Sequence, residues 1–154
     1  ANKDWWKAVK AYDDALAVLP KQQVNVARRV RLERAKAQMF VAQLPAASAE
    51  LKTLVSELQE DPRSDPKLLD DARAALANSQ YYRTWLMRLE GLPRSDWEPE
   101  IDAARQTYKL RAEKNSSSDD DAAAGQQYKE DLESVIRLAR MDLSDLQGLP
   151  LPSQ

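Results

Sequence analysis

Apolar residues recur along this chain at spacings of three and four residues, which is the period of an α-helix. The most regular stripe of this kind lies between Pro66 and Gly91. Its members follow one another in steps of +4, +3, +4, +3, +4 and +3: Leu68, Ala72, Ala75, Ser79, Tyr82, Leu86 and Leu89. Because these positions fall on one face of a helix, the pattern predicts a helix over residues 66–90 with the whole stripe buried.

Other segments of the chain show the same period and are bounded by proline or glycine, which start or stop helices. We find no sustained alternation of apolar and polar residues, so no strand is predicted. The sequence therefore predicts an all-α chain with a single helical domain over residues 1–148. Its six expected helices cover residues 4–19, 24–41, 45–59, 66–90, 96–114 and 120–146.

Two segments are predicted to lie outside the helices. Residues 115–121 contain three serines followed by three aspartates, so they are expected to form a polar loop whose last residues cap the next helix. In residues 149–154, proline alternates with leucine, which forbids a helix and favours an extended tail. Gly148 is expected to end the last helix in the left-handed conformation, and Pro99 is expected in the first turn of its helix.

Composition narrows the possible chemistry. The chain contains no cysteine and no histidine, which excludes disulfides, thiolate nucleophiles, zinc–thiolate sites and the commonest general base. Glu57, Glu60 and Asp61 lie at a polar helix end, where we interpret them as solvated carboxylates rather than a catalytic pair. The aspartates at 119–121 lack the spacing of a calcium loop. We therefore expect neither an enzyme nor a metal or other cofactor site.

The charges are nearly balanced, with 23 basic and 25 acidic residues and a net charge of −2. A nucleic-acid-binding domain usually has a basic excess, so nucleic acid is not an expected partner. No apolar run reaches the length of a membrane span, so no membrane insertion is expected. The first residues lack the apolar core of a signal peptide, which favours the cytoplasm and leaves a mature exported form open.

The first predicted helix carries a spaced set of residues that resembles the second helix of a tetratricopeptide repeat. In that family a small residue is followed by an aromatic four residues later, then by alanine three later, and then by proline five later. Ala8, Tyr12, Ala15 and Pro20 fit these spacings. The resemblance implies paired antiparallel helices, because the small residues let helices approach and proline ends the helix.

A weaker copy of this pattern follows within residues 35–60. Ala35 stands at the small position of a first helix, Ala42 stands where the family usually has a turn glycine, and Leu44 stands where it has an aromatic. Residues 66–114 keep only Ala104 and Tyr108 at the family's spacing. The resemblance thus implies a right-handed stack of antiparallel helical hairpins, a tetratricopeptide-like α-solenoid, with the last helix as a C-terminal cap.

Two groups of aromatic residues are candidate partner-binding positions. Trp5 can serve as an apolar anchor for a partner, since exposed tryptophan is typical of interface hot spots. The alternative is that Trp5 and Trp6 are divided between the core and a half-buried position. Tyr81 and Trp85, four residues apart, form a second aromatic edge. That edge faces either a ligand or, as ordinary helix packing would have it, another helix.

The helix predicted over residues 24–41 is strongly basic. Arg28, Arg31 and Arg34 share one helical face and are candidates for binding a carboxylate of an acidic peptide, since arginine suits bidentate recognition of carboxylates. The alternative is a solvated face whose cations pair with acidic neighbours.

Together these features predict a protein–protein interaction scaffold that binds a peptide or protein in a helical groove. The alternative is a structural module whose N-terminal helix pairs with a second copy, giving a homodimer, or with another part of a longer chain. The resemblance supports this alternative as well, because the first helix corresponds to the second helix of a repeat and lacks its partner.

Overall fold

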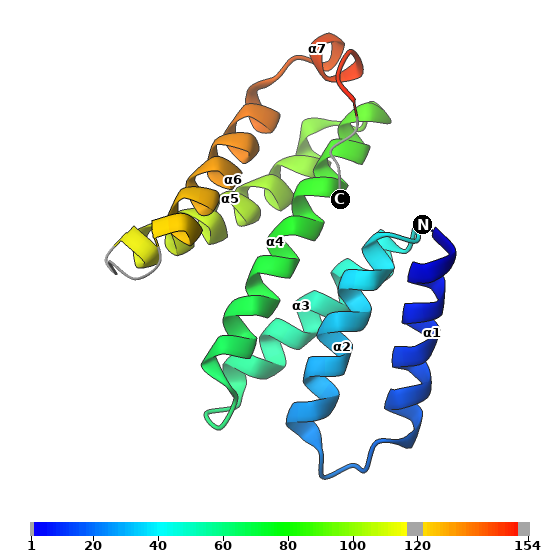
Figure 1. Cartoon of the computed structure of the whole chain (residues 1–154). Helices are drawn as coiled ribbons and strands as arrows, with labels where there is room; N and C mark the ends of the chain where they lie inside the picture. The colour runs from blue at the N-terminus through cyan, green and yellow to red at the C-terminus, as the bar shows by residue number, and fades with distance from the viewer. Residues whose placement is uncertain (1, 117–121, 151–154) are drawn as a thin grey trace. The chain divides into compact units, whose positions relative to one another are not determined.

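The computed structural model describes residues 2–116 and 122–150, and these residues form helices joined by short turns without any strand (Figure 1). The all-α prediction is therefore confirmed for this part of the chain. The expected helix-capping aspartates at 119–121 and the end of the expected tail, residues 151–154, lie outside the described residues. The helices are α1 (Asn2–Val18), α2 (Val24–Met39), α3 (Leu44–Glu60), α4 (Pro66–Leu89), α5 (Arg94–Ser116), α6 (Ala122–Arg140) and α7 (Leu143–Gln147).

The prediction of one continuous helix over residues 120–146 is wrong, because residues 122–147 form two helices. The chain leaves α6 after Arg140, and Asp142 adopts an extended conformation as the N-cap of α7. The apolar period runs on through Ala139, Leu143 and Leu146, so the periodicity gives no sign of this break. Gly148 was expected in the left-handed conformation, yet its φ is −83°.

The N-terminal end of α5 also differs from the expectation. The helix begins at Arg94 rather than near residue 96, so Pro99 lies inside the helix instead of in its first turn. Proline lacks the amide hydrogen that would bond to the preceding turn. Pro99 itself is exposed.

Two helix ends use the same backbone motif. After α4, Gly91 has a φ of +74°, and the amide of Leu92 donates to the carbonyl of Met87 at 3.0 Å. After α2, Ala42 has a φ of +59°, and the amide of Gln43 donates to the carbonyl of Gln38 at 3.1 Å. Both are Schellman ends, which satisfy a free carbonyl of the last turn. In α2, however, alanine occupies the left-handed position that favours glycine.

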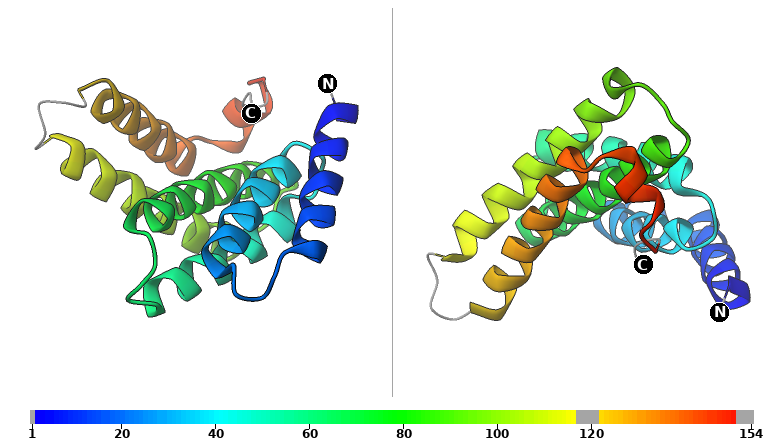
Figure 2. Two further views of the ribbon diagram at one scale, coloured as in Figure 1. Left: turned by 60° about the horizontal axis from the view of Figure 1, so that its bottom comes forward. Right: turned by 90° about the horizontal axis from the view of Figure 1, so that it is seen from above.

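The chain divides into two compact units, residues 1–79 and residues 80–154, so α4 contributes to both. We describe each unit by itself. In the first unit, α1 packs against α2, and α2 packs against α3; α1 and α2 lie side by side in every view (Figures 1 and 2). The buried apolar residues of this unit include Val9, Leu32, Ala35, Ala37, Val41, Leu44, Ala47, Leu51, Leu54, Leu58, Leu68 and Ala72.

In the second unit, α5 packs against α6, as both views of Figure 2 show. The aromatic and aliphatic side chains at the helical spacing of α5 are buried, and so are three apolar residues from α6 and α7. The buried apolar residues of this unit include Trp85, Trp97, Ile101, Ala104, Tyr108, Val135, Leu138 and Leu146.

The stripe predicted for α4 is buried only in its first half. Leu68, Ala72 and Ala75 are buried as expected, but Leu86 is 43% exposed. In its place Thr84 and Trp85 are buried. The buried face changes near the point at which the helix passes from the first unit to the second. A single stripe therefore does not describe a helix that serves two cores.

Candidate functional site

The first unit carries a stacked pair of aromatic rings, Trp5 and Phe40, and Trp6 is the next residue of α1; we call these three residues the aromatic edge. The rings of Trp5 and Phe40 are stacked, with their centroids 4.3 Å apart and their planes at 11°. Trp5 remains 39% exposed and Trp6 49% exposed. Such amphipathic rings bring a large contact area to an interface at a low cost in conformational entropy.

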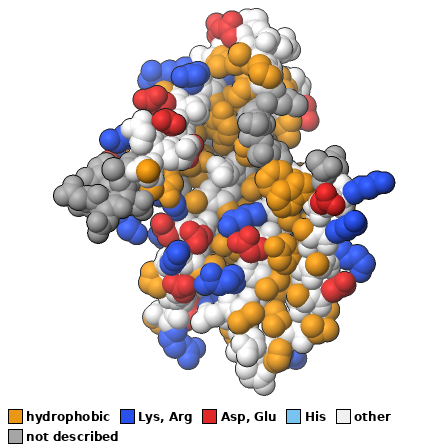
Figure 3. All heavy atoms as spheres, viewed as in Figure 1, with side chains coloured by type: hydrophobic (Ala, Val, Ile, Leu, Met, Phe, Trp, Pro, Cys, Tyr) orange, Lys and Arg blue, Asp and Glu red, His pale blue; other side chains and the backbone are white. Residues whose placement is uncertain are grey.

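The α1–α2 hairpin positions this edge. Trp5 and Trp6 lie at the start of α1, and Phe40 is the C-cap of α2, so the antiparallel packing of the two helices brings Trp5 to Phe40. In the same hairpin, Val9, Ala37 and Val41 form a buried cluster, against which Ala8 and Tyr12 pack. In the view of Figure 3, hydrophobic side chains gather along the α1–α2 hairpin, and basic side chains lie on the outer side of α1.

Phe40 is the member of this edge that the sequence does not single out. It lies 35 positions after Trp5, at the end of a helix, where a helical stripe gives no information about contacts with another helix. The signal that could have indicated it is the tetratricopeptide-like spacing, which predicts that helices 4–19 and 24–41 are antiparallel neighbours. Antiparallel packing brings the start of one helix to the end of the next.

The three candidate arginines of α2, Arg28, Arg31 and Arg34, are engaged in ion pairs inside the first unit. Arg28 is buried, and its Nη1 donates to Asp61 Oδ2 at 2.8 Å. Arg34 Nη1 donates to Asp13 Oδ1 at 2.8 Å. These contacts join α2 to α1 and to the end of α3.

Arg31 makes the most extensive of these contacts. Its Nη1 and Nη2 donate to the two carboxylate oxygens of Glu57 at 2.6 and 3.1 Å, and its Nε donates to Glu50. The hydrogen bonds from Arg31 lower the pKa of Glu57 below its usual value. In the same way, the hydrogen bond from Arg28 lowers the pKa of Asp61. The bidentate geometry is the one that arginine would use to hold a carboxylate of a ligand.

Acidic residues of the same unit therefore occupy the guanidinium groups that the sequence assigns to an acidic peptide. A ligand carboxylate that used Arg31 would have to displace Glu50 or Glu57. Partner binding by Arg28, Arg31 and Arg34 stays a prediction, and their geometry favours a role in joining α2 to its neighbours.

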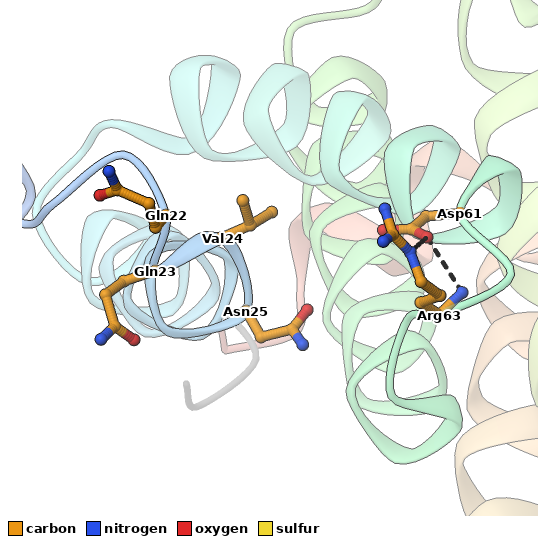
Figure 4. A pocket seen from close by; sticks show the side chains of 6 residues that line it. All are labelled: Gln22, Gln23, Val24, Asn25, Asp61 and Arg63. Carbon is orange, nitrogen blue, oxygen red and sulfur yellow. Dashed lines mark hydrogen bonds and ion pairs between the residues drawn. The ribbon is translucent and has the colours of Figure 1, made fainter.

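A pocket of about 430 Å³ lies at the beginning of α2, next to this network. In Figure 4, side chains from the start of α2 and the preceding turn lie on one side of the pocket, and Asp61 and Arg63 lie on the other. The amide of Arg63 donates to Asp61 Oδ1 at 2.9 Å. The lining side chains include three amides and the ion pair between Arg63 and Asp61. None of these side chains is a nucleophile with an adjacent base. Its residues are Gln22, Gln23, Val24, Asn25, Asp61 and Arg63.

The second aromatic edge lies in the second unit. The ring centroids of Tyr81 and Trp85 are 6.1 Å apart, with an edge-on angle of 62°. Trp85 is buried, and Tyr81 is half-buried, with burial raising the pKa of its hydroxyl. A partner role for these two residues stays a prediction; in this geometry Trp85 offers a ligand little surface.

Two properties of the described residues concern other classes of site. Across residues 2–116 and 122–150, no helix combines the length and apolar character that crossing a membrane requires. Within the same ranges, no cluster of three or more acidic residues is arranged to hold a metal ion.

Comparisons with known proteins returned no relative of this chain. No protein-family model, no curated protein and no solved structure matches it.

Proposed function

We propose that this chain is a protein-binding module of the helical-repeat type, and that its aromatic edge holds an apolar segment of a partner polypeptide. The observation that carries the proposal is the exposure of Trp5 and Trp6 on a helical hairpin that has a buried cluster of its own. Tryptophan is enriched among the few residues that supply most of the binding energy at protein interfaces.

The helical-repeat part of the proposal, a right-handed stack of tetratricopeptide-like hairpins, has support from residues 35–60. Ala35 and Ala47 are fully buried at the positions where the family has small residues. Ala42 adopts a φ of +59° at the position where the family has its turn glycine. Both features are those expected where two helices approach closely across a tight turn.

A second function is favoured by the packing of α1. This helix packs mainly against α2, and Trp6 is 49% exposed. A second copy of the chain could cover the exposed part of α1 and bury Trp6 in a homodimer. The occupant of the aromatic edge would then be the same chain rather than a different protein.

The test uses peptides selected from a random displayed library on the intact chain. Truncating a hot-spot tryptophan costs about 2 kcal/mol or more, so Trp6→Ala should weaken the selected peptides about thirtyfold. Val18→Ala on the same helix is the matched control and should leave the affinity unchanged. Equal binding of the selected peptides by Trp6→Ala and by the parent chain would contradict the proposal.

Sedimentation equilibrium separates the two functions. A monomer over the micromolar range supports a different partner. A dimer that Trp6→Ala dissociates, and that Val18→Ala leaves intact, assigns the aromatic edge to self-association instead.

A further inference from the structure

A hollow of about 440 Å³ lies along one face of α6, in the second unit. Four of its lining residues stand at relative positions 0, +3, +4 and +7, and the fifth follows at +8 just beyond the helix. This spacing places them in one line along the helix. The lining residues, which we call the α6 stripe, are Glu133, Ile136, Arg137, Arg140 and Met141.

The stripe combines an apolar floor with a cationic rim. Ile136 and Met141 are half-buried, whereas Arg137 and Arg140 are exposed. Neither arginine forms a hydrogen bond or ion pair with another residue in the part of the chain that the structure describes. The arginines of α2, in contrast, are neutralised by carboxylates at hydrogen-bond distance.

An ordinary reason for basic residues at this place is the helix dipole, since cations near a C-terminus stabilise a helix. In α6, however, Arg88 already serves this purpose. Its guanidinium is buried and donates to the carbonyl oxygens of Leu138 and Met141 at the end of the helix. The helix end therefore has its charge and its donors without Arg137 and Arg140.

The charges around Arg137 and Arg140 narrow the class of ligand that the stripe can bind. Acidic residues outnumber basic ones in residues 80–154, so Arg137 and Arg140 do not belong to a generally basic surface. Glu133 lies at the opposite end of the stripe from Arg140. A continuous polyanion such as nucleic acid or an anionic membrane would meet this carboxylate, and both need a wider basic surface than two residues provide.

We propose that the α6 stripe binds an acidic peptide segment. An apolar side chain of the peptide lies over Ile136 and Met141, and flanking carboxylates contact Arg137 and Arg140. The stripe extends over about 12 Å from residue 133 to residue 141, which an extended peptide spans with about four residues. This site is separate from the aromatic edge and does not depend on the function proposed for that edge.

The experiment measures fluorescence anisotropy of a labelled ten-residue peptide in which leucine and glutamate alternate. We expect saturable binding that weakens as salt is raised, because exposed charge pairs are screened. Arg137→Gln/Arg140→Gln should weaken binding about tenfold, as two exposed charge pairs would. Lys109→Gln/Lys129→Gln removes the same charge from exposed positions in the same unit and should leave binding unchanged. Trp6→Ala should also leave it unchanged.

Further ligands test the charge of the peptide, its apolar residues and the class of ligand separately. A peptide of alternating leucine and lysine should fail to bind the parent chain, and this arm does not depend on how any variant folds. A peptide of alternating serine and glutamate should bind at least about tenfold more weakly than the leucine peptide, because it places no apolar group on Ile136 and Met141. An oligothymidylate and phosphatidylserine vesicles should compete poorly.

Four results would overturn the proposal. The first is absence of binding by the leucine–glutamate peptide at millimolar concentration. The second is equal weakening by the arginine and lysine double variants, and the third is equal binding of the leucine and serine peptides. The fourth is tighter binding of the oligothymidylate or the vesicles.

Discussion

The guanidinium carbon of Arg88 lies 4.8 Å from the centroid of the Trp97 ring. The same guanidinium donates to the main-chain carbonyl oxygens of Leu138 and Met141, so one side chain joins α4, α5 and the end of α6 within the second unit. Burial lowers the pKa of Arg88 from the usual arginine value. Arg88 thus uses two properties of arginine: its planar cation lies over an aromatic ring, and its several N–H groups donate hydrogen bonds in a fixed geometry.

Replacing Arg88 by methionine should lower the free energy of unfolding by about 3 kcal/mol. The substitution keeps much of the apolar stem, but it leaves the carbonyls of Leu138 and Met141 without their donor. Arg88→Lys should recover little of the loss, since an ammonium group does not reproduce the fork. Urea denaturation gives the values. Arg94→Met is the control: Arg94 lies 5.8 Å from the same ring but is exposed, so we expect a loss below about 1 kcal/mol.

Ala42→Gly should stabilise the chain by about 0.5–1 kcal/mol. A left-handed conformation costs a non-glycine residue about 1–2 kcal/mol, and glycine returns part of this in its more flexible unfolded state. The exposed position loses no packing. Gly91→Ala is the reciprocal variant. A methyl group there would meet no atom within 4 Å, so the expected loss comes from the backbone alone. Thermal unfolding measures both variants. A lower stability of Ala42→Gly than of the parent chain would contradict the assigned turn.

Acidification should weaken the first unit through Glu57. The hydrogen bonds from Arg31 lower the pKa of Glu57 in the folded chain, so this carboxylate stabilises the fold above its unfolded pKa of about 4.3. That contribution is lost as the pH falls through the lower, folded pKa. Glu57→Gln should be less stable by about 1 kcal/mol at pH 7 and should lose less stability than the parent chain between pH 5 and about pH 3. Parallel urea titrations of both chains measure the difference, and identical pH profiles would speak against the Arg31 pair.

Ala75→Asp and Leu86→Asp should have different effects, although the sequence places both residues on one buried stripe. Ala75 is 4% exposed, so a carboxylate there would be buried without a partner and should cost several kcal/mol, close to the whole stability of a small domain. Leu86 is 43% exposed, so its substitution should cost about 1 kcal/mol or less. Far-UV circular dichroism during heating compares the two. Similar melting temperatures would show that the two positions are equally buried.

The sequence is informative where a helix has one apolar face and clear end residues. It predicts helices over residues 45–59 and 66–90, and the structure has α3 over Leu44–Glu60 and α4 over Pro66–Leu89. The prediction that Leu86 is buried fails because α4 contributes to two cores. A single apolar stripe describes only one buried face. The break after Arg140 escapes the sequence prediction because the apolar spacing continues across the extended residue Asp142.

The candidate sites depend on contacts that no local pattern contains. The basic face of α2 is visible in the sequence, but its partners Glu50, Glu57 and Asp61 lie 19 to 33 residues further along. Whether an arginine is neutralised depends on which carboxylate the fold brings within hydrogen-bond distance. For the same reason the sequence marks Arg31 as a candidate and passes over Arg137, which has the more accessible charge.

The membership of α4 in both compact units has a consequence for amide hydrogen exchange. Exchange from a stable helix requires local or subglobal opening, and cooperative units open with their own free energies. In α4 the amides before residue 80 belong to one unit and the later ones to the other, without any interruption of the helix between them. The protection factors should therefore form two plateaus along one continuous helix, and a mild denaturant should bring the amides of one plateau into exchange before those of the other.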